Sequence, residues 1–270
     1  MDEELGKKFA IFGSDVEYSK SPVMQEAAFK HKNINATYKK HNLKDGTKIK
    51  EEFLKAGYDG ANITTPYKEI AFELADEVRG IAKKIGAVNT YIKEEEKVIG
   101  LNTDADGFMR AIEDFGTVED VLIIGAGGTA KALAVALKKA QKRVSVVNRS
   151  ADKLNFFKEL GCIVNSWRDY HLDAYDLIVN ATSVGLKEEY PFKKSKLENI
   201  FINSSFAFDC IYAKETPFLA LAKEEGLKTK NGEDMLVYQG ALALEYFADI
   251  KNDKNLIEIM KDSLEEELIK

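Results

Sequence analysis

Residues 121–132 read Val-Leu-Ile-Ile-Gly-Ala-Gly-Gly-Thr-Ala-Lys-Ala, and this stretch decides the fold. Four apolar residues of strand character run into a glycine-rich turn, and a helix-forming segment follows the turn. Gly125 permits a tight turn, Gly127 lets the backbone approach a pyrophosphate, and the small Ala130 allows the helix to pack on the strand. The start of the helix adds free N–H groups and the positive end of the helix dipole. The stretch predicts a dinucleotide site built from Gly125, Ala126, Gly127, Gly128, Thr129 and Ala130.

The next expected strand, residues 143–147, indicates which dinucleotide is bound. A unit that binds NAD carries Asp or Glu about 20 residues after the glycines, where it accepts hydrogen bonds from the ribose 2′-hydroxyl. This chain instead has Asn148, Arg149 and Ser150 there, with Lys153 one turn further on. Arg149 can form charge-assisted hydrogen bonds to a 2′-phosphate, which an acidic residue would repel. We therefore expect NADP, held by these four residues, and the nearby Asp152 is the one feature that favours NAD.

Short β-branched runs alternate with amphipathic stretches on both sides of this unit, which predicts an α/β fold. In the first series we expect a helix over 22–32 capped by Ser21, and a helix over 66–76 opened by Pro66. From residue 120 the strands 120–124, 143–147, 176–180 and 201–209 form a second, more apolar series, as in a parallel sheet covered on both faces. The pattern changes near Asp104, and two helices, 234–249 and 256–269, end the chain. We expect two α/β domains with a cleft between them.

Bulk composition excludes several classes of function. The 270 residues carry 39 basic and 45 acidic side chains, a net charge of −6 that gives no general attraction to nucleic acid or anionic lipid. The acidic N-terminus and the strand-sized apolar runs argue against a secretory signal and a membrane span, so we expect a cytoplasmic protein. Cys162 and Cys210 are far apart, without neighbouring metal-ligand spacing, which predicts reduced cysteines and no metal site.

Four polar segments, at 19–22, 62–68, 86–90 and 100–104, fall at expected strand ends or turns. Such positions collect ligand contacts in open α/β sheets. Ser19 and Ser21, just before a helix, suit capture of a carboxylate, although Ser21 alone could serve only as a cap. Lys68 could equally be a solvated surface charge, and Asp104 could cap the next helix. Each segment by itself leaves both interpretations open.

Together, these segments resemble the shikimate dehydrogenase family over nearly the whole chain. The family's Ser-x-Ser-Pro element is matched at Ser19 and Ser21, and its Asn-Val-Thr-x-Pro-Phe-Lys element at 62–68. The remaining matches, in chain order, are Gly-Ala-x-Asn-Thr at Asn89, Asn-Thr-Asp at Asp104, Gly-x-Gly-Gly at 125–128, Asn-Arg-Thr at 148–150, Asn-x-Thr at 180–182, Asp-x-x-Tyr at 209–212 and Met-Leu-x-x-Gln at 235–239. The order of the elements is preserved throughout.

The resemblance implies an NADP-dependent oxidoreductase that reversibly reduces 3-dehydroshikimate to shikimate in chorismate and aromatic amino acid biosynthesis. It implies a substrate-binding domain, 1–104 plus 235–270, and a Rossmann-like NADP-binding domain, 105–234. Lys68 and Asp104 are implied as the catalytic pair, with the lysine as acid or base and the carboxylate orienting it. The implied substrate contacts are Ser19, Ser21, Asn62, Thr64, Asn89, Tyr212 and Gln239, and the later coenzyme contacts are Thr182 and Ser183. The expected partners are small molecules only, on a monomer or homodimer.

The chain departs from the family pattern in one loop. Asn-Pro usually follows the family's tyrosine, whereas residues 213–217 here are Ala-Lys-Glu-Thr-Pro, and Gly232-Glu233 replaces a glycine pair. Three alternatives therefore stay open. One is a quinate/shikimate dehydrogenase that prefers NAD, and another is a reductase of a different small acid. The third is a non-catalytic NADP-binding sensor, which would be expected to lack Lys68 or Asp104, and this chain has both.

Overall fold

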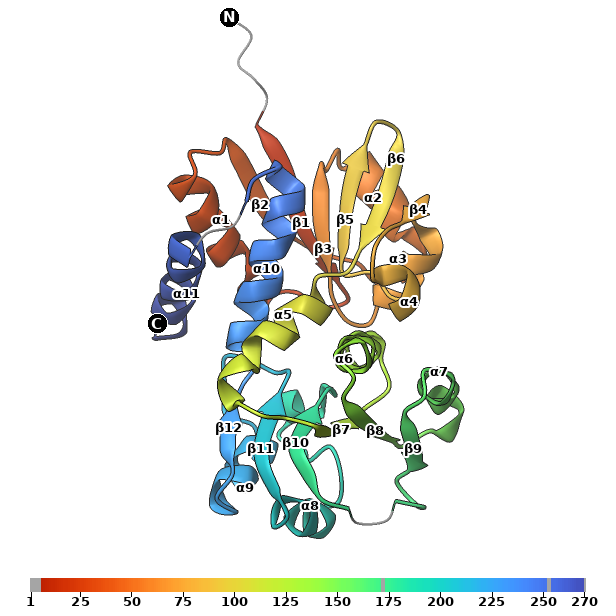
Figure 1. Ribbon diagram of the computed structural model, residues 1–270. Coiled ribbons are helices and arrows are strands. Elements are labelled where there is room, and N and C mark those ends of the chain that lie inside the picture. Colours follow the sequence, from red (N-terminus) through yellow and green to blue (C-terminus); the bar gives the residue numbers. More distant parts are fainter. Residues whose placement is uncertain (1–5, 171–172, 252–253, 270) are drawn as a thin grey trace, which may run out of the picture. The chain divides into compact units, whose positions relative to one another are not determined.

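A computed structural model describes residues 6–170, 173–251 and 254–269. The chain forms two compact units, one from Met1–Gly107 with Leu236–Lys270 and the other from Phe108–Met235. The first unit is therefore assembled from two segments that are distant in the sequence. The colours of Figure 1 show this directly, since the blue helices α10 (Glu233–Ala248) and α11 (Lys254–Ile269) pack with the red N-terminal elements.

The first unit is built on a six-stranded mixed sheet in the order β2-β1-β3-β5-β6-β4. Strand β1 is parallel to β2 and β3, while β5 is antiparallel to both β3 and β6. The strands are β1 (Lys7–Gly13), β2 (Ala36–Asn42), β3 (Gly60–Ile63), β4 (Glu77–Val78), β5 (Thr90–Glu94) and β6 (Lys97–Leu101). The mixed directions bring the ends of β1, β3 and β6 and the start of β5 to one edge of the sheet.

Helices cover both faces of this sheet. They are α1 (Ser21–His31), η1 (Gly46–Lys48), α2 (Ile49–Lys55), α3 (Lys68–Leu74) and α4 (Ala82–Ile85), with α10 and α11 from the C-terminal segment. Because side chains alternate along β1, Phe9 joins the core with α1, α10 and α11, whereas Phe12 joins the core with α2 and α3. The ring of Phe9 stacks on the ring of Phe247 in α10, with the two ring centroids 4.7 Å apart. A Cβ on Gly60 would lie 2.6 Å from the Phe247 ring, so a glycine is needed where α10 crosses β3.

The second unit has a six-stranded sheet in the order β12-β11-β10-β7-β8-β9, and every pair in it is parallel. The strands are β7 (Asp120–Ile124), β8 (Arg143–Asn148), β9 (Ile163–Ser166), β10 (Tyr175–Asn180), β11 (Ser204–Asp209) and β12 (Lys228–Lys230). From β7 the chain adds β8 and β9 on one side of the sheet, and then β10, β11 and β12 on the other side, so the strand order reverses between β7 and β10. Dinucleotides bind outside the carboxyl ends of the strands at such a reversal.

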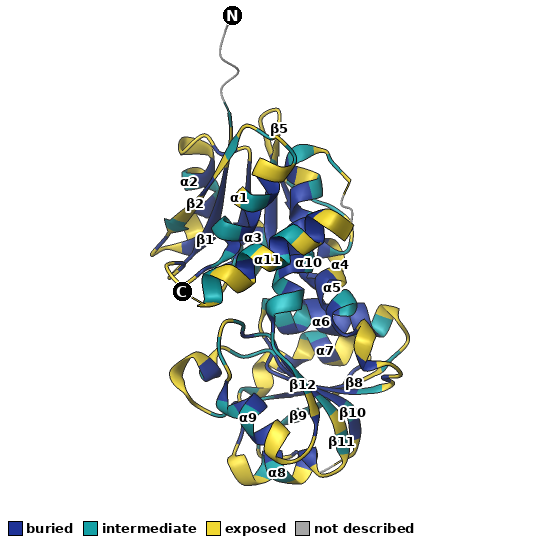
Figure 2. Ribbon diagram, turned by 90° about the vertical axis from the view of Figure 1, so that its left-hand side faces the viewer, coloured by how far each residue is buried: buried dark blue, intermediate teal, exposed yellow. Residues whose placement is uncertain are grey.

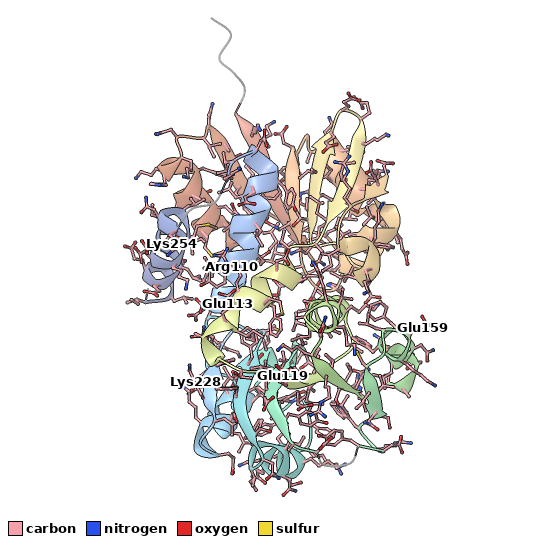
Figure 3. The ribbon with its side chains drawn as sticks, viewed as in Figure 1. Arg110, Glu113, Glu119, Glu159, Lys228 and Lys254 are labelled. Atoms are coloured by element: carbon pink, nitrogen blue, oxygen red, sulfur yellow. The ribbon has the colours of Figure 1, made fainter. Side chains whose placement is uncertain are left out.

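The helices of this unit are α5 (Asp104–Ala111), η2 (Glu113–Phe115), α6 (Gly128–Lys139), η3 (Ala151–Leu154), α7 (Asn155–Glu159), η4 (Val184–Lys187), α8 (Lys194–Phe201) and α9 (Pro217–Glu224). α5 begins in the first unit and ends in the second. Figure 2 shows dark blue, buried segments in the inner strands of both sheets, whereas the edge strands β2, β4, β9 and β12 are mostly exposed or half-buried. Figure 3 labels Lys228 at the start of β12. Its Nζ donates to the Asp114 carbonyl at 2.9 Å and lies 5.5 Å from the Phe115 ring centroid, which fixes η2 against β12.

The predicted α/β class and the parallel second sheet are confirmed, but three expected boundaries are wrong. Ser21 is the first residue of α1 and does not cap it; the Ser19 hydroxyl accepts from the Ser21 N–H at 3.3 Å. Pro66 does not open a helix, because it lies in a turn closed by the Tyr67 N–H on the Thr64 carbonyl, and α3 begins at Lys68. Phe201 belongs to α8, where it is buried with Leu197 and Ile200, so β11 starts only at Ser204.

Candidate active site

The polar segments of the first unit meet at one edge of its sheet. The register pairs Phe12 with Ile63, Asn62 with Thr90, and Thr90 with Leu101. The residues that follow β1, β3 and β6 and precede β5 are therefore neighbours in space. These are the segments that carry the predicted substrate and catalytic side chains.

Lys68 and Asp104 form a close ion pair at this edge. The Lys68 Nζ lies 2.6 Å from Asp104 Oδ2, and the two side chains are only 12% and 6% exposed. Both residues begin helices, α3 and α5. A cation at a helix N-terminus is unfavourable with respect to the dipole, and an anion is favourable. Asp104 therefore offsets the poor local position of Lys68 and holds an ammonium group where general acid–base chemistry can use it.

Asn89 fixes the Asp104 carboxylate from the other side. Its Oδ1 accepts from the Thr103 N–H at 2.8 Å and from the Thr90 hydroxyl at 3.0 Å. Because a backbone N–H can only donate, this contact determines which way the amide faces. The Nδ2 then donates to Asp104 Oδ1 at 2.9 Å. Asn89 thus holds one oxygen of the carboxylate and Lys68 holds the other.

Asn102, rather than Asp104, caps the start of α5. The Asn102 Oδ1 accepts from the N–H groups of Asp104 and Ala105, at 3.1 and 3.4 Å, at the start of α5. Its Nδ2 donates to the Ala87 carbonyl at 3.0 Å. The suggestion that Asp104 serves only as a helix cap is therefore wrong, since Asn102 performs that role.

Gln239 reaches the same cluster from α10. Its Oε1 lies 3.3 Å from Asn89 Nδ2 and 3.4 Å from the Thr103 hydroxyl, and its Nε2 donates to the Leu236 carbonyl at 2.8 Å. Gly107 allows α5 and α10 to approach, because a Cβ there would lie 2.9 Å from the Gln239 backbone nitrogen. The approach of two helices thus places an amide from the C-terminal segment beside residues of the N-terminal one.

The remaining predicted substrate residues of this unit lie on the neighbouring segments. Ser19 and Ser21 are buried at 4% and 3% exposure before and at the start of α1. Asn62, near the end of β3, is held by the buried Tyr38, whose hydroxyl donates to Asn62 Oδ1 at 2.7 Å. Thr64 is half-buried, with its N–H on the Phe12 carbonyl at 2.9 Å. These groups offer hydroxyls and amides, which suit a ligand that carries a carboxylate and hydroxyls.

The glycine turn of the second unit follows β7. Gly125 has a φ of +119°, and a Cβ on it would lie 3.0 Å from the Thr182 side chain, so the turn requires glycine. Ala126 and Ala130 are buried, Gly128 and Thr129 are half-buried, and Gly127 is exposed with nothing within 4 Å of an added Cβ. The backbone at Gly127 is therefore open to a ligand at the N-terminus of α6. This geometry fits a pyrophosphate bound by N–H groups.

The residues after β8 lie beside that turn. The Gly125 N–H donates to the Val147 carbonyl at 2.9 Å, which ties the ends of β7 and β8 together. Asn148 closes the next turn through Nδ2 on the Ser150 carbonyl at 3.0 Å. Arg149 and Lys153 are exposed, and Ser150 is half-buried. The two cations are thus available to an anionic group near the glycine turn.

A buried carboxylate organises the segments on the opposite side of the turn. Asp209, at the end of β11, accepts from Asn180 Nδ2 at 3.0 Å, from the Thr216 hydroxyl at 2.6 Å and from the Ile211 N–H at 3.0 Å. Burial raises the pKa of this carboxyl, and the three hydrogen bonds oppose that rise. Asn180 Oδ1 in turn accepts from the Thr182 N–H and hydroxyl. The network sets Thr182 against Gly125.

The loop that departs from the family pattern follows Asp209. Tyr212 is half-buried on it, and Ala213 has a φ of +67°, a left-handed conformation that costs a non-glycine residue free energy. The Ile211 carbonyl accepts from the Gly232 N–H at 2.9 Å, which joins this loop to the segment before α10. Ser183, also predicted for the coenzyme, is exposed just before η4.

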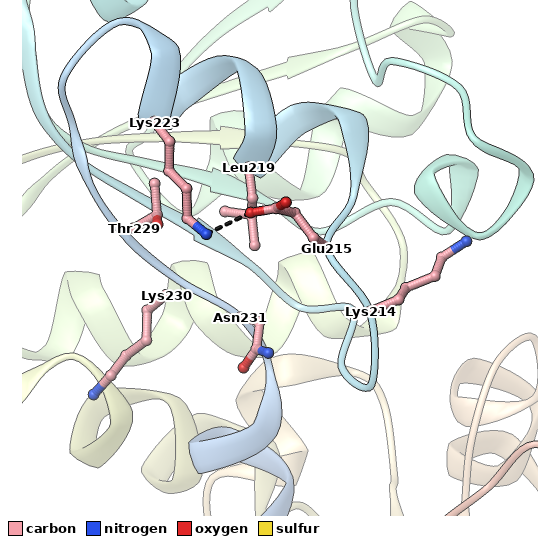
Figure 4. A pocket seen from close by; sticks show the side chains of 7 residues that line it. All are labelled: Lys214, Glu215, Leu219, Lys223, Thr229, Lys230 and Asn231. Atoms are coloured by element: carbon pink, nitrogen blue, oxygen red, sulfur yellow. Dashed lines mark hydrogen bonds and ion pairs between the residues drawn. The ribbon is translucent and has the colours of Figure 1, made fainter. Parts of the chain in front are cut away.

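A separate open groove of about 320 Å³ is lined by Lys214, Glu215, Leu219, Lys223, Thr229, Lys230 and Asn231 (Figure 4). Its lysines already have carboxylate partners. Lys223 pairs with Glu215, Lys214 with Glu188 at 2.6 Å, and Lys230 with Asp234 at 2.8 Å. No residue predicted for substrate or coenzyme lines it.

Within the described ranges, no cluster of three or more His, Cys, Asp or Glu side chains suits a metal ion, and none of the helices has the length and apolar character of a membrane span.

Comparison with known proteins agrees with this arrangement. Residues 11–91 match the family model described as the shikimate dehydrogenase substrate binding domain, and residues 110–210 match that of shikimate/quinate 5-dehydrogenase. The NADP(+) shikimate dehydrogenase of Helicobacter pylori strain J99 is 42% identical over 249 residues, which cover 90% of this chain and 93% of that protein. The chain belongs to the shikimate dehydrogenase family.

Two further relatives extend the family comparison. The NADP(+) shikimate dehydrogenase of Helicobacter hepaticus is 40% identical and covers 94% of this chain and 95% of its own. The crystal structure of the Thermus thermophilus shikimate dehydrogenase, in complex with NADP(H) and shikimate, has a TM-score of 0.83 and 32% identity, covering 96% and 99% of the two chains. The predicted membership of the shikimate dehydrogenase family is confirmed.

In this member of the family, the structure brings Lys68, Asn89, Asp104 and Gln239 into one hydrogen-bonded cluster. Tyr212 and the coenzyme residues belong to the other unit. The sequence prediction missed Tyr38, Asn102 and Gly107. Asn102 has a recognisable signal, an Asn two residues before a helix start. Tyr38 and Gly107 have none, because their partners, Asn62 and Gln239, are fixed only by the tertiary fold.

Proposed function

We propose that the protein catalyses the NADP-dependent, reversible reduction of 3-dehydroshikimate to shikimate, a step in chorismate and aromatic amino acid biosynthesis. The observation that carries this proposal is the buried Lys68–Asp104 pair, 2.6 Å between Nζ and Oδ2, in a chain of the shikimate dehydrogenase family. A non-catalytic NADP-binding sensor would not need this pair. The relatives named above are NADP(+) enzymes.

Lys68 acts as the general acid in the reductive direction. Bound NADPH supplies a hydride to the ketone carbon of the substrate. The Lys68 ammonium donates a proton to the carbonyl oxygen as it becomes a hydroxyl, and in the reverse direction the neutral amine accepts that proton. Asp104 holds the Nζ in place, and its other oxygen is held by Asn89 at 2.9 Å. The chain therefore fixes the proton donor before the substrate arrives.

Side chains on neighbouring segments hold the rest of the substrate. The hydroxyls of Ser19 and Ser21 bind the carboxylate, in a buried place where hydrogen bonds are strengthened by the low local dielectric. Asn62, Asn89 and Gln239 bind the ring hydroxyls, because amides offer both donors and acceptors. Thr64 and Tyr212 contribute near the carboxylate end.

The coenzyme is held by the second unit. Gly125, Ala126, Gly127, Gly128, Thr129 and Ala130 form the pyrophosphate turn, and Thr182 and Ser183 line its other side. Asn148, Arg149, Ser150 and Lys153 bind the adenosine ribose and its 2′-phosphate. The open backbone at Gly127 and the exposed side chains of Arg149 and Lys153 support this assignment.

Initial rates with the purified protein test the proposal, with shikimate and quinate each crossed with NADP and NAD. We expect rapid turnover only with shikimate and NADP. Comparable turnover with NAD or with quinate would overturn the specificity. Absence of turnover in all four mixtures, with NADP still bound by the protein, would favour the sensor or a reductase of another small acid.

We further propose that the reaction takes place in the cytoplasm, on a monomer or a homodimer. Cys162 and Cys210 are not joined in a disulfide bond, as expected in a reducing compartment. Cell fractionation and light scattering of the purified protein test these two points. Recovery in the periplasm, or a mass of three or more chains, would contradict them.

A further inference from the structure

Lys131 projects from the glycine-turn helix toward the segment that follows β8. It is the fourth residue of α6, and its N–H donates to the Gly127 carbonyl at 3.0 Å. Its ammonium nitrogen lies 5.3 Å from the centroid of the Phe156 ring, on α7. Helices α6 and α7 pack against each other, as Figure 1 shows. The aromatic face thus holds this cation beside the segment that includes Arg149 and Lys153.

The position is electrostatically unusual. The first turn of α6 has no acidic residue, and a lysine close to the positive end of a helix dipole is unfavourable. Arg149 and Lys153, both exposed, add two positive charges on the neighbouring segment, and only Asp152 opposes them there. The chain as a whole carries a net charge of −6, so this local excess of cations is not a general property of its surface. A doubly charged anion would stabilise such a group of cations.

We propose that Lys131 is a specificity-determining residue that binds the 2′-phosphate of NADP together with Arg149 and Lys153. The inference rests on the proposed function and deepens its coenzyme site. The pyrophosphate takes the N–H groups at the start of α6, by Gly127 and Gly128, and needs no lysine there. The Lys131 ammonium is instead held over Phe156, three residues after Lys153 on the segment that follows β8, and the start of that segment recognises the ribose 2′-substituent in this fold.

Calorimetric titration of the coenzyme-free protein with two fragments tests the assignment. Adenosine 2′,5′-bisphosphate carries the 2′-phosphate, and 5′-AMP lacks it. Replacement of the lysine in Lys131→Gln is expected to raise the Kd for the bisphosphate about tenfold and the Kd for 5′-AMP less than about twofold, because one charge-assisted contact is lost. Lys131→Arg is expected to bind both fragments within about threefold of the unchanged protein, because the charge is kept.

Lys139→Gln is the matched control, since Lys139 is an exposed lysine at the far end of the same helix. It is expected to bind both fragments like the unchanged protein. An unaltered Kd for the bisphosphate in Lys131→Gln would overturn the inference, as would an equal loss for both fragments, which indicates a pyrophosphate or structural role. Thermal melting confirms that each variant is folded. Failure of the unchanged protein to oxidise shikimate with NADP would instead contradict the proposed function.

Discussion

Lysine side chains are usually exposed to solvent, but the side chain of Lys68 is largely buried. Its side chain is 12% exposed at the first residue of α3, and its stable partner is the Asp104 carboxylate. A residue in an environment that is unfavourable for its type is expected at a functional site, where other residues of the fold stabilise it. Asn89 and Asn102 supply them here, one by holding Asp104 and the other by capping α5 in its place.

The first prediction concerns catalysis by this lysine. Lys68→Ala is expected to lower kcat for shikimate oxidation by about 10²–10⁴-fold with a modest change in KM, because it removes the proton acceptor and only a small part of the binding surface. Steady-state kinetics with NADP measures both constants. Lys84→Ala, which removes an exposed lysine of α4, is the control. Near-normal kcat in the Lys68 variant would remove Lys68 from the mechanism.

The second prediction concerns His41, whose pKa is lowered by burial, with a smaller opposing effect of Glu52. The folded protein therefore binds fewer protons than the unfolded chain just below the ordinary histidine pKa of 6.5. His41 contributes stability that is present above this pKa and is lost as the pH falls through the lower, folded value. The ring stacks on Phe12 at 4.3 Å, so His41→Phe keeps the packing.

Urea unfolding at about pH 8 and about pH 5 checks this contribution. The free energy of unfolding of the unchanged protein is expected to fall more between these two values than that of His41→Phe. His31→Phe is the control, because His31 is exposed at the end of α1. Equal losses in the unchanged protein and in His41→Phe would show that His41 is not linked to folding.

At the scale of elements, one threonine joins a helix to a strand. The Thr216 hydroxyl donates to the buried Asp209 at 2.6 Å and accepts from the Leu219 N–H at the start of α9. A Cβ on Gly185 would lie 2.9 Å from the Thr216 methyl group, so η4 packs on the same residue. The loop with Tyr212 is therefore held at both of its ends.

The third prediction follows from these contacts. Thr216→Val keeps the shape but leaves Asp209 with one donor fewer and α9 without its cap, so the free energy of unfolding is expected to fall by about 2–4 kcal/mol. Thr216→Ser is expected to recover most of this loss because it keeps the hydroxyl. Denaturant unfolding measures both variants. A valine variant as stable as the serine variant would show that the hydroxyl contributes nothing.

Helices and strands could be predicted where one sequence signal, such as a run of apolar residues, dominates. The strands β7, β8 and β10 are mostly apolar and buried on both faces, so their positions follow from the sequence. The short β4, β9 and β12 have few buried side chains, and their strand conformation depends on a neighbour already in place. The same distinction holds in the site. The motifs locate Lys68 and Asp104, but the orientation of Asn89 depends on the Thr103 N–H, which only the fold brings near.

At the scale of the whole molecule, the two units differ in how the chain supplies them. The second unit is continuous and has its own core cluster, which includes Leu122, Ile178 and Phe218. The first unit needs both of its segments. One face of β1, with Phe9 and Ile11, packs on residues of α10 and α11, among them Leu244 and Phe247.

The fourth prediction is that the two units behave differently as fragments. Residues 108–235 alone are expected to unfold cooperatively, because their core is complete. Residues 1–107 alone are expected to lack a cooperative transition, because the apolar face of β1 is left uncovered, and addition of 236–270 through a flexible linker is expected to restore it. Circular dichroism during urea titration measures all three fragments. Cooperative unfolding of 1–107 alone would show that α10 and α11 are dispensable.

The two-segment origin of the first unit also sets an order of events on the ribosome. Its N-terminal sheet is made before the second unit, whereas helices α10 and α11, which cover one face of that sheet, are made only after it, from Leu236–Lys270. The second unit is synthesised in between and can fold meanwhile. Until α10 and α11 have been made, the nascent chain therefore exposes the Phe9 face of β1 to other chains and to chaperones. Strand β1 is made before the second unit, yet it reaches its final packing after that unit has been synthesised.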